Sequence, residues 1–287
     1  MLDFILIAMG LAGLVWSSDK FVEGAAAIAN HAGMSPLLIG MTIVSLGTSA
    51  PEIVVSIMAS LSGSGELAVG NALGSNITNI GLVLGVTLLI RSIAIDASTT
   101  KREIPQMVIV TLLAGVLMAD GVLSITDGAL LLFGLLIFLT LLALRGAMPY
   151  GAIESDPKLT PLKAWGIFSI GLVLLVISSR LLVLGAVNIA TSLGVSELII
   201  GLTIVAIGTS LPELAAAVMS ALKGHSDIAI GAIVGSNVFN LFVVLGAPGL
   251  LGPLTLNANV MSRDWPVTLL TAGTLLLLAL ATYRNAK

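Results

Sequence analysis

The chain has 287 residues, a formal net charge of −3 and no cysteine. Apolar residues make up 57% of it and charged residues only 9%, with a mean hydropathy of +1.13, whereas a soluble domain has about 25% charged residues. These values exclude a soluble domain, a nucleic-acid-binding surface and a thiolate metal site, and they predict an integral membrane protein.

The apolar runs predict nine membrane-spanning helices, taking about 20 apolar residues per crossing. Helices are expected because a backbone in lipid must satisfy its own hydrogen bonds and the runs are too long for barrel strands. The predicted fold class is therefore all-α. The spans are expected at residues 3–29, 35–61, 66–90, 103–119, 124–145, 163–191, 196–222, 227–251 and 264–284.

The two halves of the chain repeat each other at an offset of 161 residues. Gly40–Glu52 returns as Gly201–Glu213, each time with Thr-Ser-x-Pro before the acid, and Gly74–Asn79 returns as Gly235–Asn240. No insertion interrupts this register, so the halves are two copies of one unit. Because each unit has five spans, the copies face opposite ways and form an inverted repeat.

This register sets the expected domain boundaries. The first repeat is placed at residues 1–145, the linker at 146–162 and the second repeat at 163–287. The offset puts the partner of the fifth span beyond Lys287, so we expect a tenth helix to be absent from this chain.

Lysine and arginine predict the orientation in the membrane. They follow the third and seventh spans, fill the central linker and end the chain, whereas the opposite connectors hold only Arg263. By the positive-inside rule, the linker is cytoplasmic and the N-terminus lies outside the plasma (inner) membrane.

The repeated acids indicate a cation site. A charged acid at the bilayer centre costs about 2.5 to 3.5 kcal/mol on insertion scales, so two acids in one setting indicate use. Pro51 and Pro212 should break their helices and free carbonyls about four residues earlier, near Gly47 and Gly208. Hydroxyl oxygens beside the two acids come from Thr48, Ser49, Thr209 and Ser210.

The third and eighth spans add more oxygen atoms, and each is expected to have a flexible point at Gly74 or Gly235. Each pair of Ser and Asn is four residues apart and so shares a helix face: Ser75 with Asn79, and Ser236 with Asn240. Hydrogen bonds between helices are the alternative role for these four residues. An all-oxygen set favours calcium, sodium or potassium over zinc or copper.

The paired Gly-Thr-Ser-x-Pro-Glu and Gly-Ser-Asn-x-x-Asn segments resemble the alpha repeats of the cation/calcium antiporter superfamily, in its sodium/calcium exchanger branch. The resemblance covers residues 40–85 and 201–246 and most of the chain between them, and it indicates a prokaryotic member. It implies calcium ligands at Glu52, Glu213, Thr48 and Thr209. It implies sodium sites that involve Ser45, Ser49, Ser75, Asn79, Ala206, Ser210, Ser236 and Asn240.

The resemblance also implies ten helices, which agrees with the helix expected beyond Lys287. No cofactor is expected, and the expected partners are calcium, sodium and the lipid bilayer, with the chain acting as a monomer. Two carboxylates carry a charge of −2, which one calcium ion or competing sodium ions can balance. Rocking of the first and sixth spans against the rest would provide alternating access.

Other couplings and functions remain open at this point. Potassium-dependent exchangers carry an aspartate where Asn240 stands, and proton-coupled exchangers have a Glu-His pair that the third span lacks, so sodium is favoured. A cation channel usually builds its filter at an oligomer axis rather than from a doubled site in one chain. An enzyme is not expected, because no nucleophile and base pair is found.

Charged residues also occur in the first and sixth spans. Asp19, Lys20 and Glu23, with Arg180 opposite Asp19 in the repeat register, predict a salt bridge at the membrane rim, with a gate as the alternative.

Overall fold

The computed structural model describes residues 2–145, 159–195, 204 and 206–285. Two predicted features lie partly outside these residues. They are the central linker, over 146–158, and the start of the seventh span with the beginning of its motif, over 196–203 and 205.

The first half of the chain folds into helices at each predicted span. The second and third spans are each composed of several helical segments, two of which are π-helices. In chain order the elements are α1 (Leu2–Ala32), α2 (Pro36–Ile39), η1 (Gly40–Val44), α3 (Ser45–Thr48), α4 (Ala50–Leu61), α5 (Gly65–Thr78), η2 (Asn79–Leu84), α6 (Gly85–Ile90), α7 (Ala97–Lys101), α8 (Glu103–Leu117), β1 (Val122–Leu123) and α9 (Ile125–Arg145).

The described part of the second half follows the same order. Its elements are α10 (Pro161–Ser192), α12 (Ala206–Thr209), α13 (Leu211–Leu222), α14 (Ser226–Phe239), η4 (Asn240–Val244), α15 (Gly246–Leu251), β2 (Leu254–Thr255), η5 (Val260–Asp264) and α16 (Trp265–Asn285). The prediction of an all-α chain is confirmed, since the two-residue strands β1 and β2 are the exception within the described residues.

Six of the described helices are long and apolar enough to cross a membrane, and the bent pair Pro36–Thr48 and Ala50–Leu61 makes a seventh span. The two other predicted spans coincide with shorter helices. One is α8, with 15 residues, and the other is α12 with α13, whose beginning lies outside the described residues.

The two halves share element boundaries at the predicted offset. Segments α3, α4, α5 and α6 correspond to α12, α13, α14 and α15 with both ends shifted by 161 residues. Gly63 and Gly224, which end the bent spans, have φ values of +76° and +81°. One hydrogen bond joins equivalent residues, because Asn76 Nδ2 donates to the Asn237 carbonyl at 3.1 Å. These relations are consistent with an inverted repeat.

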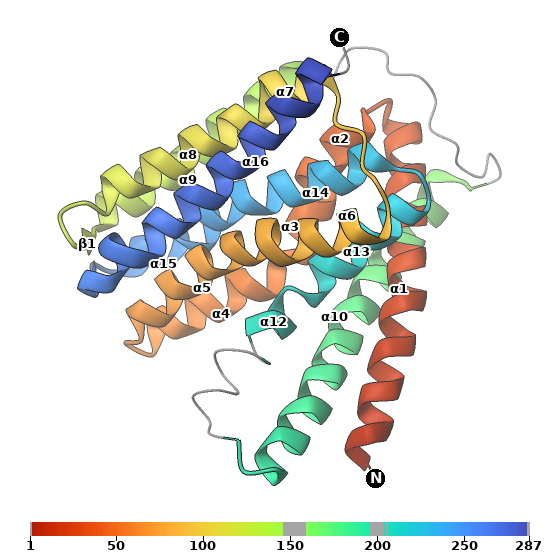
Figure 1. Ribbon diagram of the computed structural model, residues 1–287, viewed down its shortest axis with the longest axis horizontal. Helices are drawn as coiled ribbons and strands as arrows, with labels where there is room; N and C mark the ends of the chain where they lie inside the picture. Colours follow the sequence, from red (N-terminus) through yellow and green to blue (C-terminus); the bar gives the residue numbers. More distant parts are fainter. Residues whose placement is uncertain (1, 146–158, 196–203, 205, 286–287) are drawn as a thin grey trace.

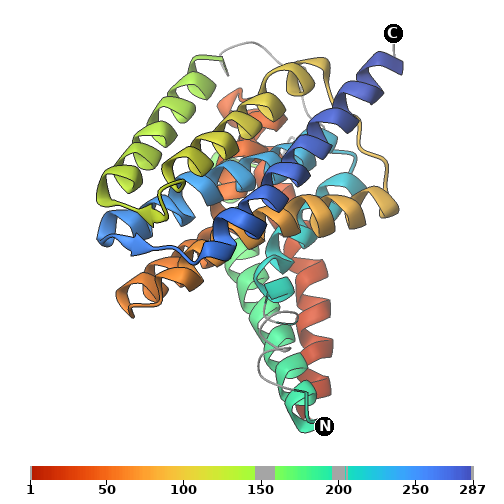
Figure 2. The ribbon, with the colours of Figure 1, turned by 60° about the vertical axis from the view of Figure 1, so that its left-hand side comes forward.

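Helices α1 and α10 form a pair that stands apart from the other helices, as both ribbon views show (Figures 1 and 2). Glycines let the two backbones approach closely. A Cβ atom on Gly24 would lie 2.5 Å from the Phe168 nitrogen, and one on Gly171 would lie 2.6 Å from the Phe21 nitrogen. Small residues of this kind are the usual basis of close helix packing in membranes.

Helix α14 lies at the centre of the remaining helices, and every residue from Ile228 to Phe239 is buried. It packs against the segmented second span, where a Cβ atom on Gly235 would lie 2.6 Å from the Met41 Cα. This contact brings the motif of the eighth span against the helix that leads to Glu52.

The connectors gather at two ends of the molecule, in agreement with the predicted grouping. At one end β1 and β2 pair, with Val122 opposite Thr255. At the other end the Lys101 ammonium lies 4.8 Å from the centre of the Tyr283 ring. Which end faces the cytoplasm stays a prediction.

Candidate cation site

The second span bends where the sequence predicts a break. The axes of Pro36–Thr48 and Ala50–Leu61 differ by 46°, and the break is at Ser49, with φ −81° and ψ 1°. Pro51 is the second residue after it and cannot donate the hydrogen bond of a continuous helix. Ser210 has nearly the same backbone, with φ −91° and ψ 6°, so the break repeats in the second half.

The two breaks bring the acids into one buried site. Glu52 is 1% exposed and Glu213 is 6% exposed, and the two are near enough for their charges to interact. Ser49 Oγ donates to Glu213 Oε1 at 3.3 Å, and the Thr48 side chain lies beside the same carboxylate. The break of the first repeat therefore serves the acid of the second.

Buried oxygen atoms without a hydrogen-bond partner gather among these motif residues. Within the described part of the chain, they include both carboxylate oxygens of Glu52 and Oε2 of Glu213. They also include the hydroxyls of Ser210 and Ser236 and the amide oxygens of Asn76, Asn79, Asn237 and Asn240. Burying a polar atom without a partner costs about 1 to 3 kcal/mol, and a hard cation would offset this cost for an all-oxygen set.

The described residues contain no group of three or more His, Cys, Asp or Glu side chains that could hold a metal ion. The site thus combines two acids with neutral oxygens. This composition suits an ion that must also leave, because the number of charged ligands sets how tightly calcium is held.

Some predicted ligand atoms have protein partners in this conformation. The Ser45 carbonyl accepts from Ser49 N at 2.9 Å and from Thr48 Oγ1 at 3.3 Å. The Gly208 carbonyl, which Pro212 was expected to free, accepts from Ser179 Oγ of α10 at 2.9 Å. The proline does remove the helical donor, but a neighbouring helix supplies another.

The third and eighth spans differ from expectation in where they are distorted. The helices continue through Gly74 and Gly235, and the irregular segments begin later, as the π-helices η2 at Asn79 and η4 at Asn240. The expected flexible points at the glycines are therefore wrong, although π-helical turns are frequent at functional sites. The residues of these spans that were predicted to be ligands are all buried: Ser75, Asn79, Ser236 and Asn240.

Three asparagines near the acids were not among the predicted site residues. Asn76 and Asn237 lie within the repeated motif, so the repeat register was a signal for them. Asn71 Nδ2 donates to the Glu52 carbonyl at 3.1 Å and to Ser56 Oγ at 2.9 Å. Its counterpart in the second half is Ala232, so no repeat signal marks Asn71.

The two other predicted ligands lie in α12. Thr209 is half-buried, and Ala206 is the first residue of that short helix.

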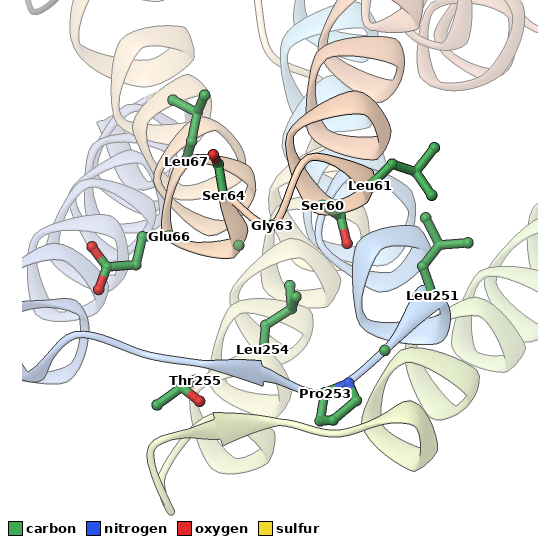
Figure 3. A pocket seen from close by; sticks show the side chains of 12 residues that line it. Ser60, Leu61, Gly63, Ser64, Glu66, Leu67, Leu251, Pro253, Leu254 and Thr255 are labelled. Carbon is green, nitrogen blue, oxygen red and sulfur yellow. The ribbon is translucent and has the colours of Figure 1, made fainter.

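A cavity of about 890 Å³ lies apart from the acids, between the connector at Ser60–Leu67 and the segment Leu251–Thr255. Figure 3 shows its wall of backbone, hydroxyl and leucine side chains, with the Glu66 carboxylate pointing away from Ser60 and Pro253. The candidate site is more enclosed than this hollow, and it is identified by its chemistry rather than by its volume.

The charged residues of α1 pair differently from the prediction. Asp19 Oδ1 lies 2.8 Å from Lys223 Nζ at the end of α13, and Lys20 lies 2.7 Å from Glu23. Arg180 is not part of this group. The pair Asp19–Lys223 joins the α1–α10 unit to the other helices.

Comparison with known proteins gives consistent matches along the chain. The family model described as sodium/calcium exchanger protein matches residues 2–144 and 163–287. CaxA of Alkalimonas amylolytica is 47% identical, over 96% of this chain and 89% of its own. Sodium/calcium exchanger MaX1 of Methanosarcina acetivorans is 30% identical, over 92% and 87%.

A solved structure is similar over the same length. The sodium-calcium exchanger NCX_Mj, soaked with Na⁺ and Ca²⁺, superimposes with a TM-score of 0.85 at 33% identity, over 97% of this chain and 90% of its own.

Proposed function

The chain belongs to the sodium/calcium exchanger family, and on that premise we propose that it exchanges calcium for sodium at the Glu52–Glu213 site. The family makes it a multi-pass membrane transporter of the cation/calcium exchange class and not an enzyme. The identity of the ions, their ligands and the transport cycle are our proposals.

The buried pair of acids with unpartnered oxygens around it is the observation that carries this proposal. Two carboxylates that repel each other in a low-dielectric site need positive charge nearby. One calcium ion, or two sodium ions, would balance them. Since the same oxygens serve both ions, calcium and sodium compete, which is the requirement for exchange at one site.

We assign the ligands as the resemblance implies. Calcium is held by Glu52 and Glu213 with oxygens of Thr48 and Thr209. The sodium ligands are Ser45, Ser49, Ser75, Asn79, Ala206, Ser210, Ser236 and Asn240. The contact from Ser49 to Glu213 supports a shared set, because it joins a proposed sodium ligand to a calcium ligand.

The packing supports a transport cycle in which α1 and α10 move together against the other helices. Close glycine contacts join this pair, whereas the ion pair Asp19–Lys223, which links it to the other helices, is partly exposed. Such an ion pair contributes about 0 to 1 kcal/mol and can break readily. The two repeats, 1–145 and 163–287 with the linker between them, would then each contribute one moving helix.

Calcium uptake into proteoliposomes under an imposed sodium gradient tests the proposal. Glu52→Gln and Glu213→Gln should each abolish uptake, because either change removes half of the site's negative charge. The control is Glu66→Gln, which alters an exposed carboxylate in α5 and should transport normally. Full uptake by either site variant would contradict the assignment, and uptake driven only by a proton gradient would favour proton coupling instead.

A further inference from the structure

Arg180 is a positive charge inside a membrane-spanning helix, and the proposed ligand set gives it no role. Helix α10 has 32 residues, Pro161–Ser192, or about 48 Å at 1.5 Å per residue, and Arg180 lies well away from both ends. A charged side chain at such a depth usually faces a bundle interior or a water-filled cavity and marks an ion pathway.

The surroundings of Arg180 place it beside both helix breaks. It lines a small cavity of about 20 Å³ together with Pro51, Thr209 and Pro212, which is room for about one water molecule. The neighbouring Ser179 donates to the Gly208 carbonyl, and this bond fixes the turn of α10 that carries Arg180 against α12.

The charge of Arg180 acts on the site rather than on a salt-bridge partner. It is near enough to Glu52 for a direct charge interaction. Within the described residues, none of the ion pairs involves Arg180. A guanidinium stays charged under all physiological conditions, so this positive charge is permanent.

The repeat shows that helix packing does not demand a basic residue here. The counterpart of Arg180 in the first half is Asp19, which has the opposite charge and pairs with Lys223 at 2.8 Å. The flanking serines are retained, since Ser179 corresponds to Ser18. The two copies therefore agree around this position and differ in the sign of its charge.

We propose that Arg180 is a tethered cation that competes with the transported ions for the Glu52–Glu213 pair and thereby sets their affinity. This inference rests on the proposed function. When no ion is bound, the guanidinium balances part of the carboxylate charge. An entering cation is repelled by it, and because the Coulomb energy scales with the product of the charges, calcium is repelled about twice as strongly as sodium.

Binding measurements on the full chain in detergent test this role. By titration calorimetry, Arg180→Gln should bind calcium roughly ten-fold more tightly and sodium more tightly by a smaller factor. Arg180→Lys should stay near the wild-type values. Lys163→Gln is the matched control, because it removes the same charge from an exposed position on the same helix. A structural role would instead predict weaker binding in Arg180→Gln, and unchanged or weaker calcium binding would overturn the proposal.

A second measurement varies only the charge. The chain has no cysteine, so Arg180→Cys can be modified with a neutral or an ammonium-bearing methanethiosulfonate reagent of similar size. The neutral adduct should bind calcium more tightly than the cationic adduct. Equal dissociation constants for the two adducts would overturn the inference, even if Arg180→Gln does not fold.

The same assay separates this inference from the proposed function. If Glu52→Gln retains full calcium binding, the proposed site itself is wrong. If Glu52→Gln loses calcium binding while the two adducts of Arg180→Cys bind equally, the site stands and only the role of Arg180 fails.

Discussion

Glu52 and Glu213 occupy equivalent positions in the two repeats, yet their surroundings differ. Glu213 accepts a hydrogen bond from Ser49, whereas both carboxylate oxygens of Glu52 have no partner in the described part of the chain. Glu52 therefore depends more on a bound cation. Asn71, which holds the Glu52 backbone, keeps this carboxylate in place without satisfying it.

The hydroxyl of Ser49 gives a prediction at this scale. It serves Glu213 directly and is a proposed sodium ligand, so Ser49→Ala should weaken sodium binding. Loss of a hydrogen bond to a charged group costs about 1.5 to 3 kcal/mol, which corresponds to a factor of roughly ten or more in the dissociation constant. Titration of sodium into the purified protein measures it, with Ser62→Ala in an exposed connector as control. An unchanged sodium affinity would remove Ser49 from the site.

The predictable residues are those that chemistry or the repeat marks twice. The acids and their neighbouring hydroxyls were found because a charge in an apolar run is costly and the same motif returns 161 residues later. Asn71 escaped because Ala232 replaces it in the second copy. The Ser179 bond to Gly208 escaped because it depends on how α10 packs, which local sequence does not encode.

At the scale of elements, proline predicted the broken spans, but the π-helices were not foreseen. Pro51 forbids a helical hydrogen bond whatever surrounds it, so the break near Ser49 could be located. The segments η2 and η4 contain no proline. Their extra residue per turn is set by packing around Asn79 and Asn240, so the sequence marked the correct residues but the wrong site of distortion.

The α1–α10 pair depends on glycine at its contacts. A Cβ atom on Gly24 would lie 2.5 Å from the Phe168 nitrogen, and backbone cannot yield as a flexible side chain can. Gly24→Ala should therefore lower the free energy of unfolding by about 1 to 3 kcal/mol, measured by thermal unfolding in detergent.

Gly166→Ala in α10 is the matched control. Nothing lies within 4 Å of the position of its added Cβ, and alanine favours the helix by up to about 1 kcal/mol over glycine. Equal unfolding temperatures for the two variants would show that the pair tolerates separation.

At the scale of the whole molecule, the fold divides into the α1–α10 unit and the helices that hold most of the site. Glu52, Glu213, Ser236 and Asn240 belong to the second group, whereas Arg180 and Ser179 belong to the first. Movement between the groups would change the surroundings of the acids on one side only. The composition predicted a membrane protein and the repeat its two halves, but this division required the structure.

Cross-linking can test whether the two groups move during transport. Asp19 and Lys223 join α1 to α13, so Asp19→Cys with Lys223→Cys, bridged by a short bifunctional maleimide, should fix α1 in place. Exchange should then fall to background while calcium binding is retained, because neither residue belongs to the proposed ligand set. The chain has no native cysteine to react.

The strand pair supplies the control for this cross-link. Val122 and Thr255 are opposite each other in β1 and β2, and both belong to the group that holds the acids. Val122→Cys with Thr255→Cys, bridged in the same way, should leave calcium uptake unchanged, since no motion is proposed between them. If the Asp19–Lys223 cross-link also leaves uptake unchanged, α1 does not move against α13 and alternating access must arise within the other helices.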